Sequence, residues 1–167
     1  MPYRRLGGLP PVAAIPAPST TSTWRRRTIP AAATFVDTSG LYAVLDRDDG
    51  FHQRAATSWR SLVEQNAALL TQSYVLLELV ALAQRRLGMD AVRALSDDLL
   101  PLVRVVWVDE ALHEMGMTAL RAAAERDISL VDWISFEVMR QRGVAQAFGF
   151  DSHFRDHGFT LLPEARR

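Results

Sequence analysis

Residues 34–46 read TFVDTSGLYAVLD, and this stretch decides the fold. Residues 34–37 form a short apolar run that an acid closes, as expected of a buried strand in a parallel sheet. Apolar residues then recur at helical spacing between Leu41 and Leu45, before a turn over residues 46–50. The stretch therefore predicts a strand that leads directly into a helix, with Asp37 at the junction.

The alternation of strand and helix continues to residue 162. The predicted strands are 34–37, 68–71, 103–108, 145–151 and 159–162, and the predicted helices are 39–46, 52–66, 73–87, 90–100, 109–126 and 130–142. Strands separated by helices favour a parallel sheet with helices on both faces. The expected fold class is α/β: a three-layer α/β/α sandwich around a mostly parallel, five-stranded sheet.

Composition divides the chain into one domain and two short ends. Residues 1–33 are rich in Pro, Ala, Ser and Thr, hold five Arg and no acid, and show no sustained period. Such a segment predicts a disordered tail or a start codon set too early. Residues 34–163 form the expected domain, and residues 164–167 form a C-terminal tail.

The charge balance argues against nucleic-acid binding by charge alone. Residues 34–167 hold 14 Arg against 19 acids, a balance of 14 − 19 = −5. An acidic domain repels a polyanion unless its positive charge is clustered or a cation holds part of its acid. The chain has no Cys, which excludes thiolate metal sites and fits a cytoplasmic location. Neither a secretory signal nor a membrane span is expected, because Pro or charged residues interrupt the apolar runs.

Four acids are placed where a metal site would need them. Asp37 and Asp151 close predicted strands, and the carboxyl ends of parallel strands border the crevice where ligands bind. Glu78 and Asp132 lie on predicted helices that lead back to this edge. Carboxylates that share a crevice repel one another unless protons or a hard cation neutralise them, and Mg²⁺ or Mn²⁺ prefers oxygen ligands. The sequence therefore predicts a metal-dependent hydrolase.

Each acid also has a purely structural explanation. Asp37 could cap the following helix, and Asp132 completes the pattern S-x-x-D with Ser129, which is typical of a capping box. Asp151 could open a turn. Glu78 is the hardest to explain structurally, because its helix is apolar nearly all round and burial of an unpaired carboxylate costs several kcal/mol. Its alternative partner would be a neighbouring Arg.

Other residues are weaker candidates for the site. Thr38 and Ser39 are expected to contact the metal water or a phosphate, or else to cap the helix. A helix start or turn explains His52 and His153 better than metal ligation does. The three tryptophans of the domain are expected in the core: Trp59, Trp107 and Trp133.

Five segments carry a resemblance to a known family. In order they read DTSGLYAVLD from residue 37, FHQRAATSW from 51, TQSYVLLELVALAQRRLG from 71, DISLVDWISFEVMRQRGV from 127 and AFGFDSHFRDHGFTLL from 147. This order resembles the PIN-domain ribonucleases of the VapC toxin type, over about residues 35–162. The four acids match the family's four acidic positions, and Thr38 or Ser39 matches its small hydroxyl position.

The resemblance implies a divalent-metal endoribonuclease that cleaves RNA to a 5′-phosphate and a 3′-hydroxyl. Mg²⁺ or Mn²⁺ would polarise a phosphodiester oxygen and lower the pKa of a water, which Glu78 would orient or deprotonate. The expected partners are an RNA substrate, a cognate antitoxin and a second copy of the chain. The apolar helix faces near Leu41, Trp59 and Leu62 are candidate docking surfaces if they are not core.

Three alternatives stay open at this point. A non-toxin RNA-processing nuclease of the same fold would use the same acids. A haloacid-dehalogenase-type phosphatase also begins with a strand-terminal Asp, but it needs a second Asp two residues on, where this chain has Ser39. A non-catalytic binding domain would lack one or more of the four acids, and all four are present.

Overall fold

A computed structural model describes residues 33–164, so most of both predicted tails lies outside the described residues. Ala33, the last residue of the predicted N-terminal tail, is buried in the core. The strands are β1 (Thr34–Val36), β2 (Leu69–Gln72), β3 (Val103–Val106), β4 (Gln146–Phe148) and β5 (Thr160–Leu162). The helices are α1 (Thr38–Leu45), α2 (His52–Glu64), α3 (Ser73–Arg86), α4 (Met89–Ala94), η2 (Leu95–Leu99), η3 (Leu100–Leu102), α5 (Glu110–Ala123), α6 (Leu130–Arg142) and α7 (His153–Asp156). The predicted elements are all present.

The strands form one sheet in the order β3-β2-β1-β4-β5, and every neighbouring pair is parallel. The chain moves outward from β1 to β2 and β3, and then returns to the other side of β1 for β4. The order therefore reverses between β1 and β4, and an open α/β sheet binds its ligands at this kind of switch point.

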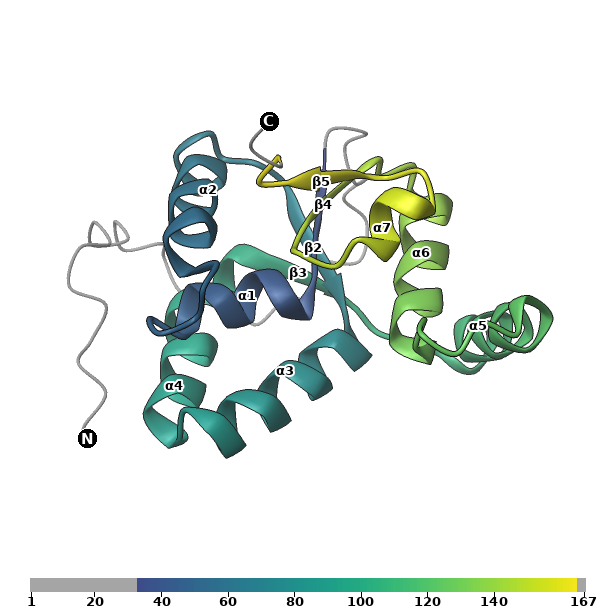
Figure 1. The fold of residues 1–167 in the computed structure, drawn as a ribbon, viewed down its shortest axis with the longest axis horizontal. Helices are drawn as coiled ribbons and strands as arrows, with labels where there is room; N and C mark the ends of the chain where they lie inside the picture. The colour runs from purple at the N-terminus through teal and green to yellow at the C-terminus, as the bar shows by residue number, and fades with distance from the viewer. Residues whose placement is uncertain (1–32, 165–167) are drawn as a thin grey trace, which may run out of the picture.

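Helices cover both faces of the sheet, as predicted. Alternate strand residues face opposite layers, so Phe35 and Val36 belong to two different buried clusters. One cluster lies under α5, α6 and α7, and the other lies under α1, α2, α3 and η2. Figure 1 shows the two groups of helices on either side of the strands, with α5 furthest from the sheet.

Local signals explain where several helices begin and end. Ser129 and Asp132 form the predicted capping box at the start of α6, and Gly143 ends this helix with a φ of 65°. Asp109 caps α5 by accepting a hydrogen bond from the Leu112 N–H at 2.9 Å. The prediction of one helix over residues 90–100 was too simple, since α4 gives way to a π turn over Leu95–Leu99 and then to a 3₁₀ turn that contains Pro101.

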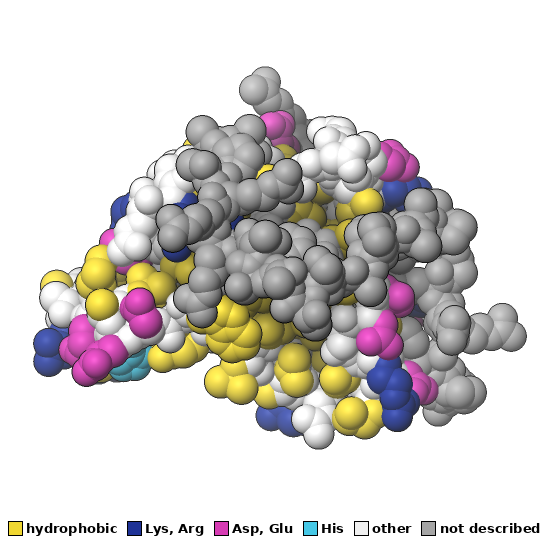
Figure 2. Space-filling view, turned by 180° about the vertical axis from the view of Figure 1, so that it is seen from behind, with side chains coloured by type: hydrophobic (Ala, Val, Ile, Leu, Met, Phe, Trp, Pro, Cys, Tyr) yellow, Lys and Arg dark blue, Asp and Glu magenta, His cyan; other side chains and the backbone are white. Residues whose placement is uncertain are grey.

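The predicted docking surface is core. Leu41 and Trp59 are each 1% exposed and Leu62 is 7% exposed, so none of them is free to bind a partner. Trp107 was expected in the core, but it is 74% exposed. Leu77 is also exposed, at 69%. Figure 2 shows hydrophobic side chains gathered low on the back face, at the level of α3 and α4. Among the described residues, no helix is long and apolar enough to span a membrane.

Candidate active site

The site lies where β1 and β4 end, at the switch point of the sheet. Asp37 follows β1 directly and caps α1, and its backbone N–H donates to the Phe148 carbonyl of β4 at 3.0 Å. Gly149 continues from β4 against this junction, where an added Cβ would lie 3.0 Å from the Asp37 Cβ. The chain therefore brings the loop after β4 into contact with the first acid.

Asp37 is buried, and its carboxylate is held by hydrogen bonds. The Ser39 hydroxyl and N–H donate to Asp37 Oδ2 at 2.6 Å and 3.0 Å. Burial raises the pKa of Asp37 to about 6, the bonds from Ser39 oppose this shift, and the charge of Asp132 adds to it. No Arg or His of residues 33–164 forms an ion pair with Asp37. A positive charge nearby would stabilise this buried carboxylate, and no basic side chain of residues 33–164 provides one through an ion pair.

Glu78 is exposed, which corrects the argument from its apolar helix. The helix α3 buries only Val75, Leu79 and Ala83, and Glu78 lies on the face that borders the site. The Thr38 hydroxyl donates to Glu78 Oε2 at 2.6 Å. No ion pair joins Glu78 to Arg85 or another basic residue in the described part of the chain. Glu78 thus reaches the site through Thr38, without the desolvation that the sequence argument assumed.

Asp132 is a capping residue that also faces the site. The N–H and hydroxyl of Ser129 donate to Asp132 Oδ2 at 2.9 Å and 2.6 Å. Both bonds use Oδ2, and no residue between 33 and 164 donates a hydrogen bond to Oδ1. Gln72, at the end of β2, holds the start of α6 in place by donating through Nε2 to the Val131 carbonyl at 3.3 Å. Capping therefore leaves one oxygen of Asp132 for a cation.

Asp151 lies three residues beyond β4, so it does not close that strand as predicted. Its Oδ1 accepts a hydrogen bond from the His153 N–H at 2.9 Å. His153 Nδ1 is also 2.9 Å from this oxygen, an ion-pair distance without hydrogen-bond geometry. His52 has a structural contact, since its Nδ1 lies 2.8 Å from the Ala43 carbonyl oxygen. Neither histidine lines the pocket described next.

The acids surround one open pocket of about 510 Å³. Glu78, Asp132 and Asp151 line it directly, as do Thr38 and Ser39, and the buried Asp37 is hydrogen-bonded to Ser39. The remaining lining residues are Tyr42, Asp49, Phe51, Leu82, Ser129 and Phe150. Within residues 33–164, no three acids or histidines are close enough to hold a metal ion between them. The structure thus brings the four predicted acids to one pocket without drawing them together at coordinating distance.

Several further residues of the pocket were not predicted from the sequence. Tyr42, Phe51 and Phe150 line the pocket together with the acids, and Gln72 supports α6 through its bond to the Val131 carbonyl. No motif marks these residues. The only available signal was position, because Phe150 lies between Gly149 and Asp151, and Phe51 ends the turn after α1.

The chain matches known proteins over the domain that contains this pocket. The sequence model of the PIN domain matches residues 34–160. The 23S rRNA-specific endonuclease VapC20 of Mycobacterium tuberculosis, from two strains, is 37% identical over 132 residues, which is 78% of this chain and 98% of VapC20.

Solved structures agree with the sequence match. The crystal structure of M. tuberculosis VapC20, described as a sarcin–ricin loop cleaving toxin, has a TM-score of 0.69 at 34% identity and covers 77% of this chain and 97% of that one. PAE2754 from Pyrobaculum aerophilum shows the same fold, with a TM-score of 0.56 at 20% identity over 87% of this chain and 93% of that one. The chain therefore belongs to the PIN-domain family, as a VapC-type member.

Proposed function

We propose that the chain is a divalent-metal-dependent endoribonuclease that acts as the toxin of a toxin–antitoxin pair. The observation that carries this proposal is the pocket at the β1/β4 switch point, with Glu78, Asp132 and Asp151 on its surface and the buried Asp37 hydrogen-bonded to the lining residue Ser39. The similarity to VapC20, a 23S rRNA-specific endonuclease, supports RNA as the substrate.

The chemistry of the four acids suits a hard cation, which takes carboxylate oxygens as ligands, although no three of them lie at coordinating distance among residues 33–164. Asp37 is buried without a basic partner, and its pKa is raised to about 6. Each of Glu78, Asp132 and Asp151 accepts hydrogen bonds from residues 33–164 through one carboxylate oxygen, which leaves the other oxygen for a cation. Asp37 and Asp132 are the proposed principal ligands, with Glu78 and Asp151 completing the set. When bound, Mg²⁺ or Mn²⁺ supplies Lewis-acid activation of the phosphodiester and of water.

The surrounding residues fix and hold these groups. Ser39 and Thr38 each donate to one acid, which sets the orientation of Asp37 and Glu78 before substrate arrives. Glu78 is the proposed base, because it is exposed in the pocket and can reach a water there. Asp37 and Asp132 are fixed by helix caps, so their positions depend on α1 and α6.

Arg residues around the pocket offset part of the domain's negative charge. Arg54 lies 5.6 Å from the centre of the Phe150 ring, and Arg85 and Arg86 are exposed in the last turn of α3. These side chains are proposed to contact phosphates on either side of the cleaved bond. The first RNA to test is the sarcin–ricin loop of 23S rRNA, which VapC20 is described as cleaving. With a ribosomal RNA as its substrate, the protein would act in the cytoplasm.

A pair of matched variants tests whether the pocket carries the activity. Asp132 and Asp109 both cap a helix, but only Asp132 lines the pocket. With Mg²⁺ and an rRNA fragment, Asp132→Asn should lose cleavage, whereas Asp109→Asn should keep it and lose at most about 1 kcal/mol of stability. Equal cleavage by the two variants would refute the assignment of the pocket.

The proposed antitoxin would block the pocket with a basic side chain. An Arg inserted among the acids pairs with carboxylates and displaces a cation. Co-expression with the adjacent small gene should relieve growth inhibition and give a complex by size-exclusion chromatography. A chain that is harmless alone and recovers no such partner would refute the toxin role while leaving the nuclease role standing.

The proposed homodimer surface is the exposed pair Leu77 and Trp107. The Val108 N–H donates to the Ser73 hydroxyl at 3.1 Å, which places the segment after β3 against the start of α3. Two large apolar side chains, 69% and 74% exposed, are therefore presented by adjoining segments. Analytical ultracentrifugation should show a dimer that Trp107→Asp dissociates, and a monomeric wild type at micromolar concentration would contradict this surface.

A further inference from the structure

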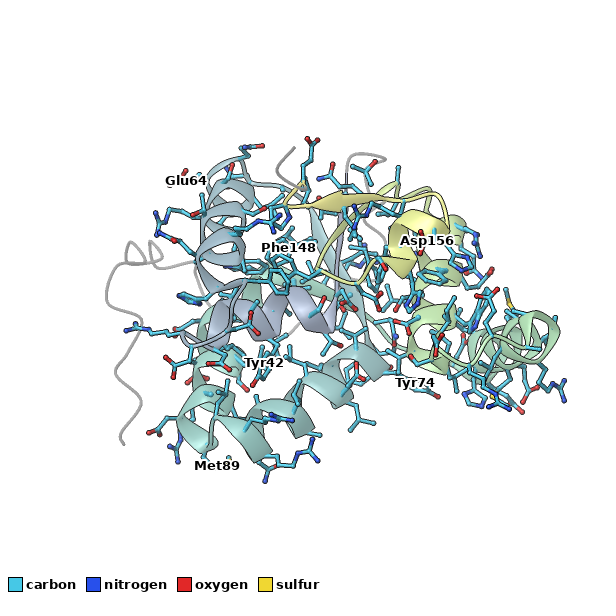
Figure 3. All side chains as sticks on the ribbon, in the orientation of Figure 1. Tyr42, Glu64, Tyr74, Met89, Phe148 and Asp156 are labelled. Carbon is cyan, nitrogen blue, oxygen red and sulfur yellow. The ribbon has the colours of Figure 1, made fainter. Side chains whose placement is uncertain are left out.

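The pocket has an aromatic wall that the metal chemistry leaves unused. We define this wall as Tyr42, Phe51 and Phe150, which line the same pocket as Glu78, Asp132 and Asp151. In Figure 3, Tyr42 lies between α1 and α3. Acids hold the metal and phosphate side of a nucleic-acid substrate, whereas an aromatic wall is suited to its bases.

Phe51 lines this pocket with a ring that is only partly covered. Its ring stacks on the Phe150 ring with centroids 4.4 Å apart and an interplanar angle of 16°. Phe51 is nevertheless 47% exposed, so the stack covers only part of it. A scattered exposed Phe needs no explanation in a globular protein. This one lines the candidate active site and is backed by a second ring, which distinguishes it from the exposed Met89.

The wall is fixed relative to the acids. The Phe150 N–H donates to the Ser39 hydroxyl at 2.9 Å, and this hydroxyl donates in turn to Asp37 at 2.6 Å. Phe150 is also the residue directly before Asp151. One short chain of bonds therefore connects the stacked rings with two of the candidate metal ligands.

The turn that carries Phe51 is also held before substrate binds. The Phe51 N–H donates to Asp49 Oδ1 at 2.7 Å, and the His52 N–H donates to the Asp49 carbonyl at 2.9 Å. Because these hydrogen bonds already fix the turn, little conformational entropy is lost when a base stacks on the Phe51 ring.

A positive charge lies beside the aromatic wall and suits an RNA ligand as well. The Arg54 guanidinium lies 5.6 Å from the centre of the Phe150 ring and donates to the carbonyls of Pro163 and Glu164. Neutral carbonyls orient this cation without cancelling its charge. Arg54 therefore places a positive charge on the aromatic side of the pocket, where the backbone phosphate of a stacked nucleotide would need one.

We propose that Phe51, backed by Phe150, stacks an unpaired base of the nucleotide adjacent to the scissile phosphate and so sets where the RNA is cleaved. The proposal rests on the ribonuclease function proposed above. A phosphate at the acids and a base on the wall belong to neighbouring positions of one strand, because a single sugar joins each base to its phosphate. The RNA must be unpaired there, since a paired base has no free face to offer a side chain.

The test compares Phe51 variants on normal RNA and on RNA with one abasic nucleotide. Phe51→Ala should lower kcat/KM about 5- to 150-fold, the range of measured base–aromatic stacking. Phe51→Leu, which keeps an apolar side chain of similar size, should lose most of the same activity, and Phe51→Trp should retain it. With an abasic site beside the cleaved bond, the wild type and Phe51→Ala should cleave at the same rate.

Controls separate this proposal from the ones on which it rests. Met89→Ala removes another large apolar side chain, 51% exposed and outside the pocket, and should cleave like the wild type. Phe51→Ala also removes the contact with the Phe150 ring, so the melting temperature of each variant is measured and cleavage is compared at a temperature at which every variant is folded. If the wild type does not cleave RNA, the ribonuclease function itself fails.

Three results would overturn stacking by Phe51 while leaving the ribonuclease function intact. The first is full activity in Phe51→Leu. The second is an unchanged effect of Phe51→Ala when either neighbouring nucleotide is abasic. The third is a Phe51→Ala variant that cleaves normally and loses only its inhibition by a partner protein, which would make the wall a protein contact.

Discussion

At the scale of single residues, Asp37 connects the fold to the proposed chemistry. Its carboxylate caps α1, accepts both donors of Ser39 and lies buried beside the charge of Asp132. Burial disfavours the ionised form, so the position costs folding free energy unless a cation occupies the site. A residue chosen for stability alone would not be an acid here.

Asp37→Asn should therefore abolish cleavage and stabilise the metal-free protein. The amide oxygen can still accept from Ser39, so the cap persists, while the proposed metal ligand is lost. Cleavage should fall more than about 100-fold, beyond the effect of removing an outer-shell partner. The free energy of unfolding in EDTA at pH 7.5 should rise, measured by urea denaturation. A destabilised variant with normal activity would contradict both parts.

The pH dependence of stability follows from the same pKa. Asp37 titrates at about 6 in the folded protein against 3.8 in the unfolded chain, so the folded state binds more protons between these values. The contribution of this group to the free energy of unfolding is therefore fully present below pH 3.8. It is lost as the pH rises through 6, by up to roughly 3 kcal/mol. Urea denaturation of the metal-free wild type and of Asp37→Asn should differ by this slope. Parallel curves between pH 4.5 and 7 would exclude the shift.

At the scale of elements, the site depends on the close approach of α1 to β4. An added Cβ at Gly40 would lie 2.6 Å from the Phe148 carbonyl oxygen and 2.7 Å from its ring. Only glycine permits this contact, which places Asp37, at the start of α1, beside the loop that carries Asp151.

Gly40→Ala should destabilise the domain by about 1–3 kcal/mol, the range typical of overpacking, and should also lower cleavage. The matched control is Gly50→Ala, because an added Cβ at Gly50 meets nothing within 4 Å and the residue is exposed. Thermal denaturation and cleavage rates of the two variants provide the comparison. Equal stability of Gly40→Ala and Gly50→Ala would show that the contact is not tight.

The elements also show how far the sequence could predict the structure. Periodicity and turn residues located every strand and the limits of α6, because Ser129 and Gly143 mark both of its ends. The burial of Glu78 was predicted wrongly, because several of its apolar neighbours are not buried themselves: α3 buries only Val75, Leu79 and Ala83, and Leu77 is 69% exposed. The aromatic wall could not be predicted, because Phe51 and Phe150 are 99 positions apart and meet only through the tertiary fold.

At the scale of the whole molecule, the acidic domain needs cations to approach RNA. Because the four acids lie around one pocket, cation binding and folding should be linked by mass action. At 100 times its Kd, a cation that binds only the folded state adds about 2.7 kcal/mol to the free energy of unfolding.

Mg²⁺ or Mn²⁺ at millimolar concentration should therefore raise the melting temperature of the wild type by several degrees. Asp37→Asn should show a much smaller rise, since one proposed ligand is missing. Differential scanning fluorimetry at constant ionic strength separates this effect from charge screening. An equal rise in both proteins would place cation binding elsewhere.

Cleavage of an RNA that carries the sarcin–ricin loop tests the proposed metal-dependent active site most directly. Purified wild type should cut this RNA at a defined position in Mg²⁺ or Mn²⁺, should stop in excess EDTA and should recover when the cation is restored. Asp37→Asn, folded and at equal concentration, should not cut it under any of these conditions. Cleavage by the wild type that persists in EDTA, or cleavage by Asp37→Asn at the wild-type rate, would contradict the site.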